Sequence, residues 1–286
     1  MSKILTKINA HLDNVSFYQT IFSMPFAYVA AILADPGTIH WDIMFWITVV
    51  VIAARSAAMG LDNYFDYKYD KQQPRLSYRA MVQGRVKGPE VLVFVAVCLV
   101  IMVLAVLQLN PLCLKLLPVA ALPFIIYPFT KRFTFLCHYC CGIAVAMAPL
   151  GGWVAVAGEV SYPMFVLYTA VALWIAGFDC AYAAQDEEFD KAHKLHSMAT
   201  KLGKVRAMWV GRITHIVALA IFYYFGQLMG LGTAYTVGVV ISAVVLYYQH
   251  TIIKPNDFSA VNKMYYTRNG YVSIAFFICT VLGLYW

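Results

Sequence analysis

The sequence predicts an all-helical, polytopic membrane protein with nine transmembrane helices around a central cavity. Hydrophobic residues make up 62% of its 286 residues and charged residues only 12%, whereas soluble domains average about 25% charged residues. This composition excludes a disordered chain and most soluble enzymes. A membrane-spanning helix needs roughly 20 apolar residues, and nine stretches approach that length. They cover residues 16–34, 42–64, 90–109, 112–130, 136–157, 162–184, 206–227, 232–252 and 268–286.

The spans follow one another without a long polar domain between them, so we interpret residues 1–286 as a single membrane domain. Two connections, at residues 65–89 and 185–205, are longer and more polar than the others. Each of them follows a span that ends in acidic residues. We therefore expect these two loops to carry the functional motifs.

The basic residues predict the orientation of the chain, because cytoplasmic loops of membrane proteins are enriched in lysine and arginine. With a cytoplasmic N-terminus, 16 of the 21 basic residues fall in inner segments, and only Lys115, near the outer end of the span 112–130, falls on the outer side. We therefore expect a multi-pass protein of the inner cell membrane, with both motif loops on the cytoplasmic side. The net charge of +7 is explained by the basic residues of the inner segments. We therefore expect no nucleic-acid partner.

More than half of the 14 acidic residues lie in two clusters at the ends of spans. Within the clusters, carboxylates recur every four residues, a spacing that stacks them on one face of a helix. The aspartates of the two clusters are Asp62, Asp66, Asp70, Asp179, Asp186 and Asp190. Like charges at this spacing repel, and carboxylates near a membrane are costly. One such cluster is typical of a polar helix end, but two on the same side of the membrane predict a cation site.

The predicted cation is Mg²⁺, which prefers oxygen ligands and is commonly held by a few carboxylates together with substrate phosphates. Two facing clusters of carboxylates would bind one or two Mg²⁺ ions that bridge to a diphosphate. All six aspartates are therefore candidate metal ligands.

Basic residues of the inner loops are candidates to bind the phosphoryl oxygens, which lysine binds as a point charge and arginine in bidentate fashion. The candidates are Lys68, Arg75, Arg79, Lys131 and Lys191, with Arg132 and Lys194 as further cations of the same loops. For any single lysine, topology alone is an equally good explanation. Arg75 and Arg79 are favoured because they lie just beyond the first acidic cluster.

Arg55 and Tyr182 are candidate site residues within the spans. Arg55 precedes Asp62 by seven residues, about two helical turns, and a charged residue so deep in a span indicates a function. It either pairs with Asp62 or meets an anionic group of a substrate. Tyr182 lies four residues before Asp186, where its ring either stabilises a carbocation or belongs to an interfacial aromatic belt.

The two acidic motifs and the pattern of spans resemble the UbiA superfamily of membrane prenyltransferases along nearly the whole chain. The family's second motif, Asp-x-x-Tyr-x-x-x-Asp-x-x-x-Asp, matches at Asp179, Tyr182, Asp186 and Asp190. Supporting segments lie at residues 20–27, 127–133, 148–153 and 195–197. The sequence is most similar to the bacterial branch of 4-hydroxybenzoate polyprenyltransferase-like enzymes, which includes members of menaquinone routes.

The chain departs from the family pattern at three places. The Asn-Arg pair of the first family motif is replaced by Asp62 and Asn63, although Asp66 and Asp70 match. The family's Arg-Thr-x-x-Arg-Pro-Leu becomes Arg-Leu-Ser-Tyr-Arg-Ala-Met at residues 75–81. The glycine that usually precedes Leu-His-Ser is Lys194.

The resemblance implies Mg²⁺-dependent transfer of an isoprenyl chain from a polyprenyl diphosphate to an aromatic acceptor of the hydroxybenzoate or hydroxynaphthoate type, as in quinone biosynthesis. It implies catalytic roles for Asp66, Asp70, Asp186, Asp190 and Tyr182. It also adds Ser197 as a substrate-binding residue, and it implies a prenyl groove that opens to the lipid bilayer.

Two other functions are compatible with parts of this pattern. A terpene cyclase of the same superfamily would ionise a prenyl diphosphate without an aromatic acceptor. A transporter would be favoured by inverted repeats and by charges near the bilayer midplane, whereas the acidic residues here lie at span ends.

Overall fold

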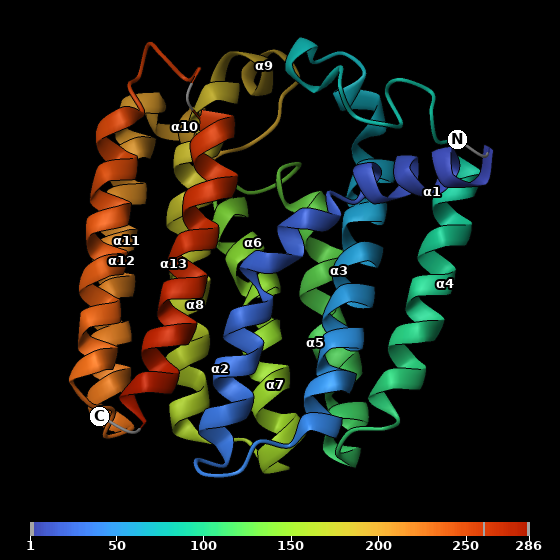
Figure 1. Cartoon of the computed structure of the whole chain (residues 1–286). Helices are drawn as coiled ribbons and strands as arrows, with labels where there is room; N and C mark the ends of the chain where they lie inside the picture. The colour runs from blue at the N-terminus through green and yellow to red at the C-terminus, as the bar shows by residue number, and fades with distance from the viewer. Residues whose placement is uncertain (1–2, 260, 285–286) are drawn as a thin grey trace.

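The computed structural model describes residues 3–259 and 261–284, and within these ranges the chain is helical throughout, without a β-strand (Figure 1). The longest helices run up and down beside one another, and the short helices α9 and α10 lie at one end of this bundle. The elements are α1 (Lys3–Asn14), η1 (Phe17–Phe22), α2 (Met24–Ala34), α3 (Trp41–Asp70), η2 (Pro74–Leu76), α4 (Gly88–Val106), α5 (Pro111–Thr130), α6 (Cys137–Val145), α7 (Met147–Ala157), α8 (Tyr162–Ala183), η3 (Ala184–Asp186), α9 (Glu187–Ala192), α10 (Met198–Leu202), α11 (Lys204–Leu228), α12 (Thr233–Ile252) and α13 (Val261–Gly283).

Seven helical segments of the described chain are long and apolar enough to cross a membrane, so the protein is a multi-pass membrane protein. Met24–Ala34 and Arg268–Gly283 are shorter apolar helices. The total of nine spans and the cytoplasmic N-terminus therefore stay predictions. The stretch 16–34 is not one helix, because a 3₁₀ segment ends at Phe22 and α2 begins with Pro25 in its first turn, where proline is tolerated.

Helix α3 ends six residues beyond its predicted span, because it continues from residue 64 to Asp70. The whole first acidic motif, from Asp62 to Asp70, is thus helical, and the predicted loop 65–89 begins only at residue 71. The predicted loop 185–205 likewise contains η3, α9 and α10. Carboxylates spaced by four therefore occupy one face of a regular helix at the end of α3.

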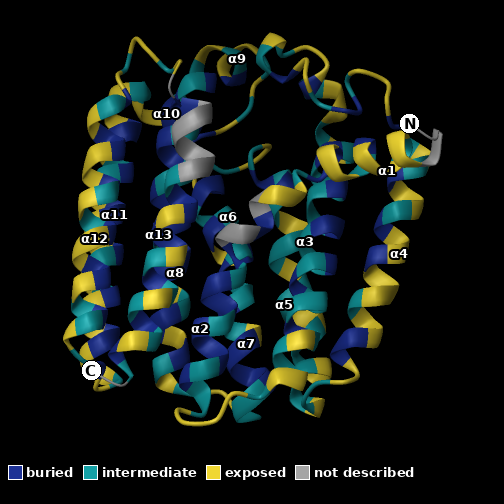
Figure 2. Cartoon of the chain, viewed as in Figure 1, coloured by how far each residue is buried: buried dark blue, intermediate teal, exposed yellow. Residues whose placement is uncertain are grey.

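The core of the bundle lies around α8, which is the most buried of the candidate spans in the described chain (Figure 2). Small residues allow α11 to approach it closely. A Cβ added at Gly211 would lie 2.6 Å from the carbonyl oxygen of Gly177, so neither position has room for a side chain. Such close approach through small residues is typical of helix packing in membranes. It fixes the end of α8 that carries the second acidic motif.

Helix α1 lies across the end of the bundle that carries α9 and α10 (Figure 1). It is held to α4 by an ion pair between Lys7 Nζ and Glu90 Oε2 at 2.8 Å. Leu5, Ile8 and Leu12 are exposed along its length. An apolar stripe on a helix of this kind is typical of a segment that lies in a membrane interface.

Candidate active site

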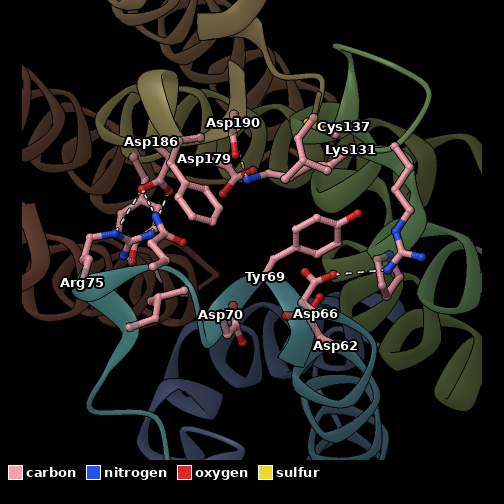
Figure 3. Close-up of a pocket in the computed structure, with 18 of the residues that line it drawn as sticks. Asp62, Asp66, Tyr69, Asp70, Arg75, Lys131, Cys137, Asp179, Asp186 and Asp190 are labelled. Carbon is pink, nitrogen blue, oxygen red and sulfur yellow. Dashed lines mark hydrogen bonds and ion pairs between the residues drawn. The ribbon is translucent and has the colours of Figure 1, made fainter. Parts of the chain in front are cut away.

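The two acidic motifs line one pocket of about 140 Å³ at the end of the bundle that carries η2 and α9. Figure 3 shows the aspartates of α3 on one side of this pocket and those of α8, η3 and α9 on the other. The aspartates that line it are Asp62, Asp66, Asp70, Asp179, Asp186 and Asp190. The structure thus brings all six predicted carboxylates to one site, although more than 100 residues separate the two motifs.

A change of helix type positions the second motif. Helix α8 ends at Ala183, a 3₁₀ turn covers Ala184–Asp186, and α9 begins at Glu187. Asp186 and Asp190 both line the pocket across this junction and are 6% and 2% exposed. Carboxylates so buried require cationic or hydrogen-bonding partners, and the chain supplies them.

Arg75 of η2 crosses the pocket to the second motif. Its Nε and Nη2 atoms donate to Asp186 Oδ1 and Oδ2 at 3.1 and 2.7 Å, and its Nη1 donates to the Tyr182 hydroxyl at 2.7 Å. Gln73 Nε2 donates to Asp186 Oδ1 at 2.6 Å. Burial lowers the pKa of Arg75, but Tyr182 and Asp186 outweigh this effect and raise it above its ordinary value. The guanidinium therefore stays charged in the pocket.

Three other cations pair with three of the remaining carboxylates. Arg79 is hydrogen-bonded to Asp70, Lys131 Nζ lies 3.7 Å from Asp190 Oδ2, and Arg132 Nη2 lies 3.6 Å from Asp66 Oδ1. These pairs are Arg79–Asp70, Lys131–Asp190 and Arg132–Asp66, each joining a loop cation to a motif carboxylate. Burial disfavours the charge of Lys131, but attraction to Asp190 and Asp186 raises the pKa of this ammonium above its ordinary value.

Asp179, the first residue of the second motif, is held by a buried histidine. His138 Nδ1 lies 2.7 Å from Asp179 Oδ2, and His138 Nε2 lies 3.2 Å from the backbone nitrogen of Met198. The Met198 N–H can only donate, so Nε2 accepts and Nδ1 carries the proton that is donated to Asp179. His138 therefore links α6, the second motif and α10.

Four predicted site residues do not line this pocket. Arg55 lies on α3, seven residues before Asp62, and is not among the lining residues, and Lys68 is exposed on the last turn of the same helix. Lys191 is exposed and pairs with Glu187 Oε1 at 2.5 Å. Ser197 is buried and accepts a hydrogen bond from the backbone N–H of Thr200, so it caps α10. Substrate binding by these four residues stays a prediction.

The structure adds residues to the pocket that the sequence analysis left out. They are Tyr69, Gln73, Leu76, Tyr127, Pro128, Cys137, Ala183, Phe189 and Leu195, with His138 behind Asp179. Arg132, a predicted cation of the inner loops, also lines the pocket. In the sequence His138 belongs to the string Cys-His-Tyr-Cys-Cys at residues 137–141, which has no second cluster to complete the four ligands of a structural zinc site. Its charge partner lies 41 residues away, so no local spacing could have indicated its role. Tyr127 is one member of a long apolar run, in which the sequence does not distinguish pocket-lining from lipid-facing positions, whereas Tyr69 and Phe189 stand inside the acidic motifs.

The carboxylates fit a hard cation that arrives with its substrate. Among the described residues, no three side chains of histidine, cysteine, aspartate or glutamate converge closely enough to chelate a metal by themselves. Aspartates nevertheless line both sides of the same pocket. Because Mg²⁺ is often bound by one or two carboxylates and completed by substrate phosphates, this divided set of oxygen donors suits such a complex.

Comparison with known proteins places the chain in a family. The model of the UbiA prenyltransferase family matches residues 23–281. The chain belongs to this family. The UbiA-family enzyme is thus a prenyltransferase, and it is 28% identical to the 4-hydroxybenzoate octaprenyltransferase of Vibrio campbellii over 256 residues, 90% of this chain and 89% of that relative. The enzyme of the same name from Vibrio parahaemolyticus is 29% identical and covers 80% of each chain.

Solved structures share the fold of this UbiA-family enzyme. A UbiA homologue from Aeropyrum pernix K1, in its apo form, has a TM-score of 0.81 and 29% identity, and covers 92% of this chain and 97% of that one. A UbiA homologue from Archaeoglobus fulgidus bound to GPP and Mg²⁺ has a TM-score of 0.74 and 17% identity, and covers 96% and 99%. The shared fold includes the end of the bundle that carries both motifs.

Proposed function

We propose that this UbiA-family enzyme catalyses Mg²⁺-dependent transfer of an isoprenyl chain from a polyprenyl diphosphate to an aromatic acceptor of the hydroxybenzoate or hydroxynaphthoate type, as in quinone biosynthesis. The observation that carries the proposal is the pocket in which six aspartates meet Arg75, Arg79 and Lys131. The names of the curated relatives and the GPP and Mg²⁺ bound to an archaeal homologue support it. The site would open on the cytoplasmic side of the inner membrane.

Four aspartates are the proposed metal ligands in this pocket, with Asp62 and Asp179 as further oxygen donors. The four are Asp66, Asp70, Asp186 and Asp190, and they lie on both sides of the pocket. Bound Mg²⁺ would neutralise charge on the diphosphate and so make it a better leaving group.

The cations of the pocket stabilise the leaving diphosphate. Arg75, Arg79 and Lys131 are already held beside the motif carboxylates. They stay charged, because carboxylate neighbours raise the pKa of each above its ordinary value despite burial. Positioned charges of this kind favour the breaking of the allylic C–O bond, since negative charge grows on the diphosphate as it leaves.

Aromatic walls of the pocket protect the allylic cation. Tyr69, Tyr127, Tyr182 and Phe189 line the site, and the faces of such rings attract cations and exclude water. The electron-rich acceptor ring attacks the cation, a C–C bond forms, and the ring proton leaves to the released diphosphate or another base.

Product analysis tests the proposal. The purified protein is supplied with Mg²⁺, prenyl diphosphates of increasing length, and a panel of hydroxybenzoates and hydroxynaphthoates, and products are identified by mass spectrometry. We expect a prenylated aromatic product for at least one acceptor and none without Mg²⁺. A cyclised hydrocarbon formed without an acceptor would instead identify a terpene cyclase.

The role of Arg55 is a separate part of the proposal. If its guanidinium meets the carboxylate of the acceptor, Arg55→Leu raises the KM for the acceptor more than the KM for the donor. Equal effects on both KM values would exclude that role.

A further inference from the structure

A second hollow lies beside the active site and is basic. It has a volume of about 640 Å³ and shares only Leu195 with the first pocket. Its lining residues come from the α5–α6 connection, from α9 and α10, and from the segment between these two helices. They are Phe133, Thr134, Phe135, Lys191, Lys194, Leu195, His196, Thr200 and Lys201. No acidic side chain of the described chain is among them.

The two walls of this basic groove are joined through the backbone. The N–H of His196 donates to the carbonyl oxygen of Lys131 at 2.6 Å, which ties the segment after α9 to the α5–α6 connection. The groove is therefore a built feature of the fold. Lys191 is paired with Glu187, whereas Lys194 and Lys201 make no ion pair with another described residue. These two lysines supply most of the net charge of the groove.

Lys194 occupies a backbone conformation that normally favours glycine. Its φ angle is +57°, in the left-handed region that is unfavourable for side chains with a Cβ. The turn that ends α9 imposes this angle, because the N–H of Leu195 donates to Asp190 O at 2.8 Å and the N–H of Lys194 donates to Lys191 O at 3.3 Å, a typical helix end. Strained backbone conformations are often retained at functional sites, so a lysine at this position indicates that its ammonium group has a function.

The groove lies where spans leave the membrane. Helices α5, α6 and α11 are parts of candidate spans, and the lining residues belong to the short segments that directly follow or precede them. Phe133 and Phe135 are 64% and 37% exposed. Exposed aromatic rings next to lysines, at the ends of spans, are typical of the headgroup level of a bilayer.

We propose that this groove binds the phosphate headgroup of an anionic membrane lipid. Lys194 and Lys201 bind the phosphate oxygens, and Phe133 and Phe135 lie among the upper acyl carbons. Basic pockets beside transmembrane helices bind anionic headgroups in this way. A soluble diphosphate fits less well, because the groove has no carboxylates for a metal and its exposed phenyl rings require an apolar partner. The groove takes no part in the proposed chemistry, so lipid binding there does not depend on the proposed function.

Native mass spectrometry of the detergent-solubilised full chain tests this site, with dioleoylphosphatidylglycerol and dioleoylphosphatidylcholine as probes. We expect the wild type to bind the anionic lipid more tightly. Since each lysine near anionic lipid contributes about 1 kcal/mol, or roughly fivefold in affinity, the double variant Lys194→Gly/Lys201→Gln should lose that preference by about tenfold or more. Lys254→Gln, which changes an exposed lysine of the α12–α13 connection, should keep it.

Two single variants separate the charge from the turn. Lys194→Gly removes the strain of the left-handed residue and should hold or raise the Tm while weakening binding of phosphatidylglycerol about fivefold. Lys194→Arg keeps the charge and should bind like the wild type. If Lys194→Gly binds phosphatidylglycerol as well as the wild type does, the lysine serves only the turn and the proposal is wrong. Displacement of the bound lipid by millimolar inorganic diphosphate would also overturn it.

Discussion

Arg75 and Asp186 are 111 residues apart in the sequence and form a bidentate ion pair, with N–O distances of 3.1 and 2.7 Å. The same guanidinium lies over the ring of Tyr182, 5.1 Å from its centroid. One loop arginine thus contacts two residues of the second motif. A diphosphate that enters with Mg²⁺ must compete with Asp186 for Arg75, and the Mg²⁺ must compete with Arg75 for Asp186. The cation and the carboxylate therefore already lie next to each other before substrate binds.

Replacement of Arg75 tests this arrangement. Arg75→Gln should lower kcat/KM for the prenyl diphosphate by about 100-fold, because a positioned charge on the leaving group is lost. Arg75→Lys keeps the charge without the bidentate geometry, so its kcat/KM should lie between the values of the wild type and of Arg75→Gln. Steady-state kinetics measure both, with Arg85→Gln as the control, since Arg85 pairs with Asp13 outside the pocket. A loss no greater than that of the control would contradict the assignment.

The two motifs should both be essential for metal-dependent transfer. Asp66→Ala or Asp186→Ala should lower turnover on the order of 1000-fold, while the protein still inserts into membranes. Removal of Mg²⁺ with EDTA should abolish the activity of the wild type, and added Mg²⁺ should restore it. Asp42→Ala, at the other end of α3, is the matched control. Near wild-type turnover of either site variant with Mg²⁺ would refute the paired-motif site.

His138 should act as a positioning residue for Asp179. His138→Gln can still donate to the carboxylate and accept from Met198, whereas His138→Leu leaves two polar groups without partners, at a cost of about 1–3 kcal/mol each. We expect the Leu variant, but not the Gln variant, to need more Mg²⁺ for half-maximal activity. Tyr139→Phe removes the neighbouring hydrogen bond to Thr214 and controls for lost stability. An unchanged Mg²⁺ requirement in His138→Leu would leave the histidine a purely structural role.

Lys131 should stabilise the fold over the whole neutral range. Its folded-state pKa is raised by Asp190 and Asp186, so its contribution is complete below the unfolded pKa of about 10.4 and is lost as pH rises through the folded pKa. The difference in Tm between the wild type and Lys131→Met should therefore stay constant from about pH 7 to about pH 9.5. Thermal unfolding at several pH values measures it, with Lys115→Met as the reference. A difference that shrinks below pH 9.5 would show that the lysine loses its proton earlier.

The helical spans and the metal-ligand candidates were predictable because their signals are local. Apolar runs define spans through the cost of placing polar groups in lipid, and a four-residue period places Asp62, Asp66 and Asp70 on one helix face. The boundaries were less accurate, since α3 continues six residues past the apolar stretch. A helix does not have to end where its hydrophobic residues end, because the hydrogen bonds within its backbone also form in the part that lies outside the membrane.

Sequence alone thus determined that the chain is a helical membrane protein with two acidic motifs and basic loops beside them. Only the tertiary structure decided which cation meets which carboxylate, that His138 holds Asp179, and that Arg55, Lys68, Lys191 and Ser197 lie outside the pocket wall. The hydrophobic composition and the four-residue spacing of the carboxylates depend only on residues that are close in the sequence. Pairs such as Arg75 and Asp186 form only when close packing, as at Gly177 and Gly211, fixes the helices that carry distant segments.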